Sequence, residues 1–307
     1  MQNKLFVLLV NYNSSDDCIQ SIGQIISIYN PNIYIVLVDN CSTDNSVNII
    51  TEWLKKNVES YIIIDDKSLF QSNNTITCRF TFILSSTNNG FAAGNNLFLK
   101  KFDLYDSWIW MLNPDSIPTK DTISYLNNNI DKFSKNDIIG GVIIDYYDHN
   151  NVIAYGGASI NFYTATIIFC KKKDRFNKID YIHGGCLIFH SNTLDSIGYM
   201  REDLFLYWEE TDWCLRAKAQ NVTLRLDENI IIYDKVGGSI GRGYLAEYYY
   251  SRNGLNIINK YKKKLLFIAL LFQFLRALLK LIKLKPSSSL GILNGVKDFL
   301  YNNEIKN

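Results

Sequence analysis

The sequence predicts an α/β fold with a mostly parallel central sheet, and two observations lead to this prediction. Short, continuous apolar runs recur through the first 112 residues, and stretches of helical length separate most of them. Continuous apolar runs are typical of parallel strands that are covered on both faces, and their alternation with helices is typical of a sheet between two helical layers. The second half of the chain is less regular and ends in a basic, apolar tail.

In the first half, each apolar run is expected to form one strand. The expected strands cover residues 5–10, 33–38, 61–64, 80–84 and 108–112. Helices are expected over residues 42–56, where Ser-Thr-Asp-Asn can cap the first turn, and over 90–101. The polar segment 65–79 is expected to be an excursion loop, with a hairpin as the alternative.

The second half is expected to add sheet, hairpin and helical segments. Sheet or hairpin material is expected at residues 138–144, 152–160, 165–170, 181–189 (broken by Gly184-Gly185), 223–226 and 230–233. Helices are expected at 207–220 and 247–264, with a glycine-rich loop at 237–243 between the last strand and the last of these helices. The chain is thus predicted to have an α/β domain over residues 1–260 and a helical tail over 261–307.

The tail combines apolar and basic residues. Eight Lys and Arg residues lie between positions 260 and 285 without an acidic residue, and the segment 265–282 between them is almost wholly apolar. Gln273, Arg276, Lys280 and Lys283 recur at helical spacing and form one narrow polar stripe. A break is expected at residues 287–289, followed by a last helix over 290–301.

Three interpretations of residues 265–282 compete. A transmembrane helix is disfavoured by Arg276 and Lys280. A helix packed on the protein's own surface is the second interpretation. The favoured one is an interfacial amphipathic helix that buries its apolar side in a bilayer, while its basic flanks pair with anionic lipid.

Composition excludes several classes of protein. The net charge of +2 argues against a nucleic-acid binder, and 47% hydrophobic residues argue against global disorder. The six cysteines form no CxxC pair, which argues against zinc and suits reduced, buried thiols in a cytosolic protein. Residues 1–4 lead directly into the first expected strand, so no signal peptide is expected.

Polar residues follow three of the expected strands, or nearly so: Asn11, Asp39 and Asn88. At one edge of a sheet they could line a nucleoside pocket, with Asp39 accepting a hydrogen bond from a pyrimidine N–H and Asn88 bonding base or ribose. The alternative is ordinary turn chemistry. The small residues around Gly90 would let the backbone approach a ligand, but no GxGxxG or P-loop motif is present.

Asp115 follows the strand at 108–112 within an Asn-Pro-Asp sequence, so its carboxylate is expected at the same edge. A carboxylate there can hold a hard divalent ion, which would neutralise a leaving diphosphate. The alternative is an Asp that caps the following helix.

Glu209, Glu210 and Asp212 crowd three carboxylates into four residues within an aromatic frame. Neighbouring helical positions point about 100° apart, so Glu209 and Glu210 cannot share one face. A carboxylate crowded against aromatic rings has a raised pKa, which suits a general base that takes a proton from a hydroxyl. The alternative is a salt-bridged helix start involving Arg216.

The three histidines, His149, His183 and His190, show no metal-binding spacing. His183, beside Gly184, could reach an acceptor molecule, although a lone histidine is more often structural.

Taken together, these motifs resemble family 2 glycosyltransferases, and the rhamnosyltransferase-like branch is the most similar. The resemblance covers residues 4–260 and is carried by segments 10–13, 38–44, 88–96, 112–115, Gly184 and 205–216. It implies a GT-A fold and inversion at the anomeric carbon of the donor sugar.

By this resemblance, Asp39 and Asn88 contact the nucleoside, and Asp115 is the surviving acid of a metal-binding DxD element. Asn113 stands where the first acid of that element often lies. Asp234 occupies a position where the family often has a histidine ligand. An oxygen ligand there would favour Mg²⁺ or Mn²⁺, or else the ligand has been lost.

The resemblance also implies that Glu210 is the catalytic base, with Glu209 as the runner-up, and places Asp212 on the acceptor side with His183 and Gly184. Arg242 in the glycine-rich loop and Arg252 on the next helix are expected to close over the diphosphate. A surface ion pair is the alternative for Arg252.

The resemblance implies an inverting, metal-dependent enzyme, favours dTDP-rhamnose as donor, and leaves UDP-glucose, UDP-galactose and UDP-N-acetylglucosamine open. The basic, apolar tail places the expected enzyme at the cytoplasmic face of the cell membrane, where a polyprenyl-diphosphate-linked saccharide acceptor in O-antigen or capsule synthesis would explain the need for the membrane. A non-catalytic, membrane-bound module that binds a sugar nucleotide or carbohydrate is the alternative from another class. A nucleotidyltransferase would need a basic, glycine-rich loop, which residues 11–17 do not supply.

Overall fold

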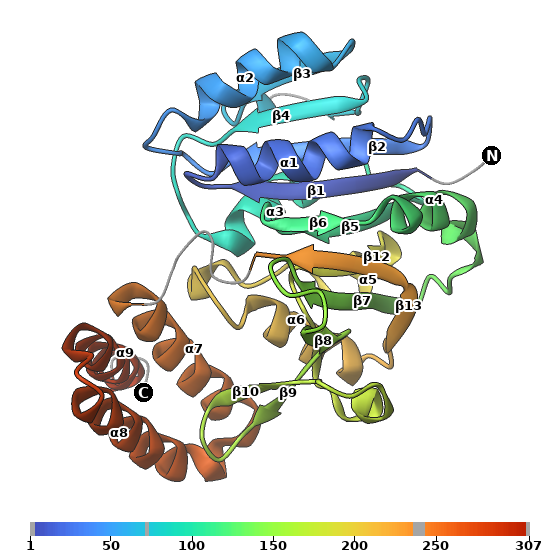
Figure 1. Cartoon of the computed structure of the whole chain (residues 1–307). Helices are drawn as coiled ribbons and strands as arrows, with labels where there is room; N and C mark the ends of the chain where they lie inside the picture. Colours follow the sequence, from blue (N-terminus) through green and yellow to red (C-terminus); the bar gives the residue numbers. More distant parts are fainter. Residues whose placement is uncertain (1–3, 71–73, 236–242, 305–307) are drawn as a thin grey trace.

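The computed structural model describes residues 4–70, 74–235 and 243–304 (Figure 1). Within these residues, the main sheet has ten strands in the order β3-β4-β2-β1-β5-β12-β7-β13-β6, with β8 paired to β7. The first five strands along this order pair in parallel, whereas β12 and β6 run antiparallel to their neighbours. The predicted α/β class with a mostly parallel core is confirmed, and the expected strands of the first half are all present.

The parallel half of the sheet is built from β1 (Leu5–Asn11), β2 (Ile33–Asp39), β3 (Tyr61–Asp65), β4 (Phe80–Leu84) and β5 (Trp108–Leu112). Its helices are α1 (Ser15–Ile26), α2 (Ser46–Asn57), α3 (Phe91–Lys101) and α4 (Lys120–Asn129). Apolar residues of α1, α2 and α4 pack on one face of the sheet, and those of α3 pack on the other. The described part of segment 65–79 contains a short 3-10 helix (Ser68–Phe70) rather than a hairpin strand.

The second half mixes strand directions. It contains β6 (Ser116–Pro118), β7 (Asp137–Asp145), β8 (Val152–Tyr155), β9 (Gly157–Asn161), β10 (Thr166–Phe169), β11 (Tyr181–Ile182), β12 (Cys186–His190) and β13 (Thr223–Asp234). The strand expected at 152–160 is divided at Gly156, which has a φ of 75°. The two strands expected at 223–226 and 230–233 are instead one long strand with an irregular register.

Two helices from the second half, α5 (Asn192–Ile197) and α6 (Glu209–Ala219), join α3 on its face of the sheet. The chain then forms three long helices, α7 (Tyr244–Lys262), α8 (Leu266–Ile282) and α9 (Pro286–Glu304). Short 3-10 helices lie at Ile130–Lys132, Lys173–Lys178, Glu202–Leu204 and Lys263–Leu265.

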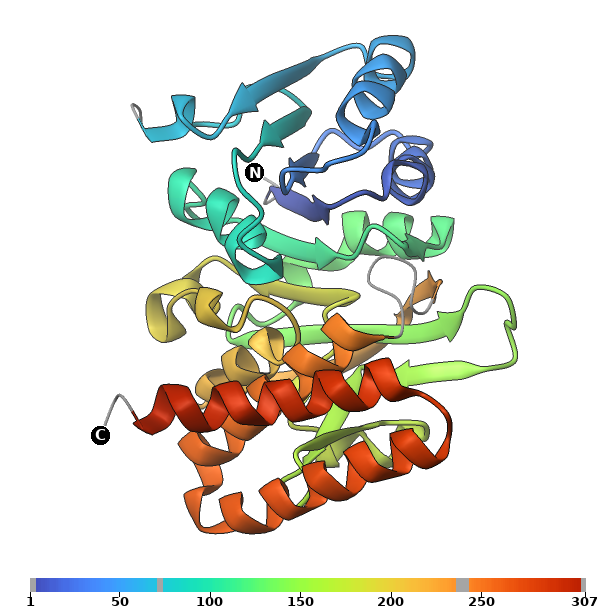
Figure 2. The ribbon, with the colours of Figure 1, turned by 90° about the vertical axis from the view of Figure 1, so that its left-hand side faces the viewer.

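Helices α8 and α9 form an outer layer beside α7 (Figure 2). Leu204 and Trp208 belong to the same hydrophobic cluster as residues of these three helices. The boundary predicted at residue 260 falls inside α7, and the break predicted at residues 287–289 is wrong because these residues begin α9. One helical stretch, Tyr244–Ile282, is long and apolar enough to cross a membrane by length and composition, and 17% of its most apolar window is buried.

Candidate active site

The first part of the site lies where β1 and β2 end. Asn11 and Asp39 are register partners on these two strands and both are buried. The Asn11 side-chain amide donates to Asp39 Oδ2 at 2.7 Å and to Ser42 Oγ at 3.1 Å, while the Ser42 backbone N–H donates to Asp39 Oδ1 at 2.8 Å. The structure therefore brings Asn11 and Asp39 together, and Asn11 sets the orientation of the Asp39 carboxylate.

Asn40 connects this edge to the loop before α3, a role that the sequence analysis missed. Its side-chain amide donates to Asn88 Oδ1 at 2.9 Å and to the Gly90 carbonyl at 3.1 Å. Asn88 Oδ1 also accepts from the Gly90 N–H. The only signal in the sequence was that Asn40 follows Asp39 directly at a strand end.

Gly90 is needed for close packing within the protein. It has a φ of 90°, and a Cβ at this position would lie 2.1 Å from the carbonyl oxygen of Phe205. The next residue, Phe91, donates its N–H to that same carbonyl at 2.9 Å. The backbone at Gly90 therefore approaches the segment around Phe205, and its expected contact with a donor stays a prediction.

The second part of the site joins Asp115 and Asp234. Asp234 ends β13 opposite Ser116 of β6, and the Ser116 hydroxyl donates to Asp234 Oδ2 at 2.7 Å. Both carboxylates are buried. Burial, and after it the charge of Asp234, raises the pKa of Asp115 to about 7. Asn113 lies in the turn before them, where its carbonyl accepts from the Ser116 N–H.

His183 and Gly185 lie next to Asp234. His183 Nδ1 accepts from the Gly185 N–H at 3.0 Å, and burial lowers the pKa of His183 against the opposing charge of Asp234. A Cβ on Gly185 would lie 2.9 Å from His183 Nδ1 and 3.1 Å from Asp234 Oδ2. Glycine thus leaves room where these polar atoms converge, and the oxygen donors of Asp115 and Asp234 fit a hard divalent ion.

Within residues 4–70, 74–235 and 243–304, no three His, Cys, Asp or Glu side chains form a ready-made metal site. A metal bound by Asp115 and Asp234 would therefore take further ligands from the substrate or water, as Mg²⁺ commonly does.

Glu210 forms the third part of the site, at the start of α6. The residue as a whole is partly exposed, and a Cβ on Gly184 would lie 3.6 Å from Glu210 Oε1. Burial raises the pKa of Glu210 to about 7. The segment from His183 to Gly185 therefore runs between Glu210 and Asp234, so the second and third parts of the site adjoin each other.

Glu209 points elsewhere. It is 2% exposed, and within the described structure its Oε2 atom has no hydrogen-bond partner. Burial, followed by the charge of Glu210, raises its pKa well above the ordinary value for Glu. Because its side chain is enclosed, Glu209 is less accessible than Glu210 to a substrate hydroxyl.

The segment before Glu209 has an unusual backbone. Phe205, Tyr207 and Trp208 all have positive φ values, of 66°, 63° and 76°. The Asn253 side chain on α7 holds the segment by donating to the carbonyls of Leu204, Leu206 and Tyr207. Left-handed backbone at non-glycine residues is costly and persists only where surrounding contacts enforce it.

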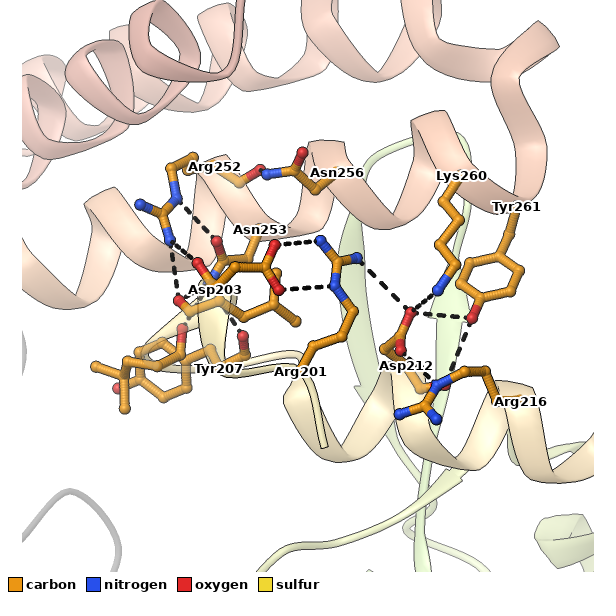
Figure 3. Close-up of polar contacts among 12 residues, drawn as sticks. Arg201, Asp203, Tyr207, Asp212, Arg216, Arg252, Asn253, Asn256, Lys260 and Tyr261 are labelled. Carbon is orange, nitrogen blue, oxygen red and sulfur yellow. Dashed lines mark hydrogen bonds and ion pairs between the residues drawn. The ribbon is translucent and has the colours of Figure 1, made fainter. Parts of the chain in front are cut away.

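Arg252 helps to hold this same segment, a contact that the sequence analysis did not predict, and its expected diphosphate contact stays a prediction (Figure 3). Its Nη2 donates to the carbonyls of Asp203 and Leu204, and its Nε donates to Asn253 Oδ1. Neither the diphosphate contact nor the surface ion pair expected from the sequence describes these bonds. Arg242, the other predicted diphosphate ligand, lies outside the described residues.

Asp212 faces α7, although the sequence analysis placed it on the acceptor side. It is fully buried, and its Oδ2 accepts from Arg216 Nε at 2.9 Å. Its Oδ1 accepts from Lys260 Nζ at 2.7 Å and from the Tyr261 hydroxyl at 2.9 Å (Figure 3). The salt bridge with Arg216, the alternative considered from the sequence, is present.

Lys235 follows Asp234 and was given no role by the sequence analysis. Its Nζ donates to Asp17 Oδ1 at 2.7 Å and to Gln20 Oε1 at 2.6 Å, both on α1. Its N–H donates to the Asp115 carbonyl. Lys235 therefore ties the end of β13 to α1 and to Asp115.

The α/β sheet and the polar groups at its strand ends define a transferase with a GT-A-like fold. Residues 6–198 match the model of glycosyl transferase family 2, and the chain belongs to this family. A curated relative is the low-salt glycan biosynthesis hexosyltransferase Agl10 of Haloferax volcanii, 24% identical over 228 residues. The match covers 73% of this chain and 64% of the relative, so the chain spans less than two thirds of that protein.

Solved structures agree on the fold. A mannosyltransferase from Pyrobaculum calidifontis, in complex with GDP-Man and Mn²⁺, has a TM-score of 0.57 and 12% identity, covering 98% of this chain and 88% of that one. S. aureus TarS 1–349, in complex with UDP-GlcNAc, has a TM-score of 0.54 and 16% identity, covering 96% and 80%. GalNAc-T7 with UDP, GalNAc and Mn²⁺ has a TM-score of 0.58 and 10% identity, covering 84% and 48%. At these identities the likeness establishes the GT-A-like fold alone.

Proposed function

We propose that this protein is an inverting hexosyltransferase in which Glu210 is the general base. The observation that carries the proposal is the placement of Glu210, a partly exposed residue whose carboxyl group lies beside Gly184 and has a pKa that burial raises to about 7. Such a group accepts a proton readily near neutral pH. It would take the proton of an acceptor hydroxyl as the hydroxyl oxygen attacks the anomeric carbon of the donor.

Asp115 and Asp234 would hold Mg²⁺ or Mn²⁺. The juxtaposition of the two buried carboxylates supports this, as does the presence of Mn²⁺ in the solved mannosyltransferase and GalNAc-T7 structures. When bound, the metal would offset the negative charge of the leaving diphosphate. Asn113, in the turn before Ser116, remains a proposed donor contact, and Arg242, which lies outside the described residues, remains one from the sequence alone.

The nucleoside would lie at the edge formed by Asp39 and Asn88. Asn11 holds the Asp39 carboxylate, and Asn40 holds Asn88, so both groups are positioned before a donor arrives. Preorganised polar groups bind without the entropy cost of ordering flexible side chains. On the acceptor side, Gly184 leaves space beside Glu210, and His183 borders it.

The favoured donor is dTDP-rhamnose, from the resemblance of the sequence, and UDP-hexoses are the alternative. The proposed acceptor is a polyprenyl-diphosphate-linked saccharide at the cytoplasmic face of the cell membrane, used in surface polysaccharide synthesis. The glycan-biosynthesis role in the name of Agl10 supports an acceptor of this class. Residues 1–260 would carry out transfer, and residues 261–307 would contact the membrane.

Thermal stabilisation by a panel of nucleotide sugars, with and without Mn²⁺, tests this proposal. A ligand that binds only the folded state raises the melting temperature in proportion to the logarithm of its concentration over its Kd. We expect a shift with dTDP-rhamnose that requires Mn²⁺ and is lost in Asp115→Asn. Asp195→Asn, at an exposed site on α5, is the matched control and should keep the shift.

Other outcomes divide the alternatives. A metal-dependent shift with a UDP-sugar alone would replace the proposed donor and keep the mechanism. Donor binding by a wild-type protein that transfers no sugar to any lipid-linked acceptor would favour the non-catalytic binding module. No shift with any nucleotide sugar, with metal present, would contradict the proposed site.

A further inference from the structure

The polarity of α8 is inverted relative to that of an ordinary surface helix. Its buried residues include Gln273, whose side-chain amide donates to the Thr164 carbonyl at 2.7 Å. Arg276 and Lys280 both pair with Glu247, a mostly buried residue of α7. Three of the four residues in the polar stripe predicted from the sequence, Gln273, Arg276 and Lys280, therefore face the protein, and the two charges among them are compensated by Glu247. Lys283, at the end of the stripe, is exposed.

The opposite face of α8 is apolar and uncovered. Nine large apolar side chains on this helix are between 44% and 70% exposed: Phe267, Ile268, Leu271, Phe274, Leu275, Leu278, Leu279, Leu281 and Ile282. An open groove between α8 and α9, lined by Phe274, Leu293 and Leu300, continues the same surface. A contiguous exposed apolar surface on this scale marks an interaction site.

Basic residues border this face at both ends. Lys262, Lys263 and Lys264 lie before α8, Lys283 and Lys285 lie after it, and all five are exposed. The sequence has no acidic residue between positions 260 and 297. An apolar strip between two groups of lysines is complementary to an anionic bilayer surface, with acyl chains beside the strip and head groups beside the lysines.

We propose that the outward face of α8 docks in the plane of an anionic membrane. The pairing of Arg276 and Lys280 with Glu247 determines this orientation, because turning α8 would leave mostly buried Glu247 without its cations. The helix therefore stays packed on α7 while its apolar face enters the lipid. This differs from a transmembrane span, in which the whole circumference of the helix would leave the protein.

Docking through α8 would also fix the catalytic helix relative to the membrane. Helix α7 contacts α8 on one side, and on the other its Lys260 bonds Asp212 of α6 (Figure 3). Its Asn253 holds the carbonyls before Glu209. The use of this arrangement to reach a lipid-linked acceptor rests on the proposed function, whereas the docking itself does not.

Co-sedimentation of the full chain with vesicles tests the proposal. We expect binding to phosphatidylcholine vesicles that contain about 30% phosphatidylglycerol, and weaker binding to phosphatidylcholine alone. Leu271→Glu and Leu278→Glu should each weaken binding by about tenfold or more, because a leucine removed from lipid contact forfeits most of its transfer free energy. Ile49→Glu, at an exposed position of α2 on the far side of the molecule (Figure 1), should leave binding unchanged.

Three results would overturn the proposal. The first is that the wild type does not bind vesicles, and the second is that Ile49→Glu loses as much vesicle binding as the α8 variants. The third is that the wild type forms dimers without vesicles in sedimentation velocity and that Leu271→Glu dissociates them. The last would assign this face to a second copy of the chain. Donor-induced thermal shifts measured on the same variants keep the two proposals apart, since vesicle binding without any nucleotide shift would retain the docking surface and contradict the proposed function.

Discussion

Two carboxylates on the same helix, α6, show opposite behaviour. Burial raises the pKa of Glu210 to about 7, and no cation is bonded to it within the described contacts. Burial also raises the pKa of Asp212, but the hydrogen bond and charge of Lys260, followed by those of Arg216, outweigh burial and leave it below the ordinary value. Two positions along an α-helix correspond to a rotation of about 200°, so the two side chains leave α6 on nearly opposite sides, Glu210 toward Gly184 and Asp212 toward α7.

The difference shows that burial alone does not identify a catalytic acid or base. Asp212 is more buried than Glu210, yet its charge is fixed by partners and its protonation state does not change near neutral pH. Glu210 has a protonation state that can change near pH 7, which proton transfer requires. The comparison therefore gives Asp212 a structural role and supports the proposal that Glu210, elsewhere on α6, is the general base.

Glu210→Gln should give the largest effect. Removing the base should lower the rate of transfer by about 10²- to 10⁴-fold, because no side chain is then positioned to take the proton from the hydroxyl of the acceptor saccharide. Donor binding, measured by thermal shift, should remain. Glu59→Gln, at an exposed position, is the control and should keep full activity. Near wild-type turnover by Glu210→Gln would show that another residue is the base and that Glu210 and Asp212 do not differ in catalytic role.

Asp212→Asn should chiefly affect stability. Loss of this charge leaves Arg216 and Lys260 without their buried partner, and we expect a loss of about 2–4 kcal/mol, less than for a fully enclosed ion pair because both cations reach solvent. Urea denaturation measures this change. Glu228→Gln removes an exposed ion pair with Lys173 and should cost no more than about 0.5 kcal/mol. Equal losses in the two variants would show that the Asp212 cluster has no special structural role.

The sequence could predict what depends on local pattern. Apolar runs located the parallel strands, and the residues after them located Asp39 and Asp115 at the edge of the sheet. The argument that Glu209 and Glu210 cannot share a face also agrees with the structure, in which Glu209 is enclosed and Glu210 is partly exposed.

What the sequence could not predict depends on partners distant in the chain. The segment from Asp203 to Phe205 packs against both Gly90 and Arg252, and neither contact could be expected from the sequence. The helical spacing on α8 predicted a polar stripe, but the side that it faces was determined by Glu247 on another helix. Such pairings follow from tertiary packing and leave no periodic signal.

The pH dependence of transfer tests whether Glu210, unlike Asp212, changes its protonation state near neutral pH. In saturating metal, kcat/KM should rise about tenfold per pH unit below 7 and level off above it, as Glu210 loses its proton. Because the folded-state pKa of Glu210 is raised, its ionisation lowers stability as pH increases from its unfolded value of 4.5 to about 7. The stability of Glu210→Gln relative to wild type should therefore be greater at pH 8 than at pH 4. A pH-independent difference would mean that Glu210 titrates normally.

Lys260→Met should give the smallest effect. Lys260 Nζ lies 2.7 Å from Asp212 Oδ1, but the lysine side chain is 40% exposed, so solvent screens the pair and we expect a loss of about 0.5–1 kcal/mol. Arg216 and the Tyr261 hydroxyl would still satisfy the carboxylate, which makes this loss smaller than that of Asp212→Asn. Urea denaturation of the variant, with exposed Lys264→Met as its control, measures the difference. A loss as large as that of Asp212→Asn would mean that Lys260 alone compensates the buried charge, and the low pKa of Asp212 would then depend on α7 rather than on α6 itself.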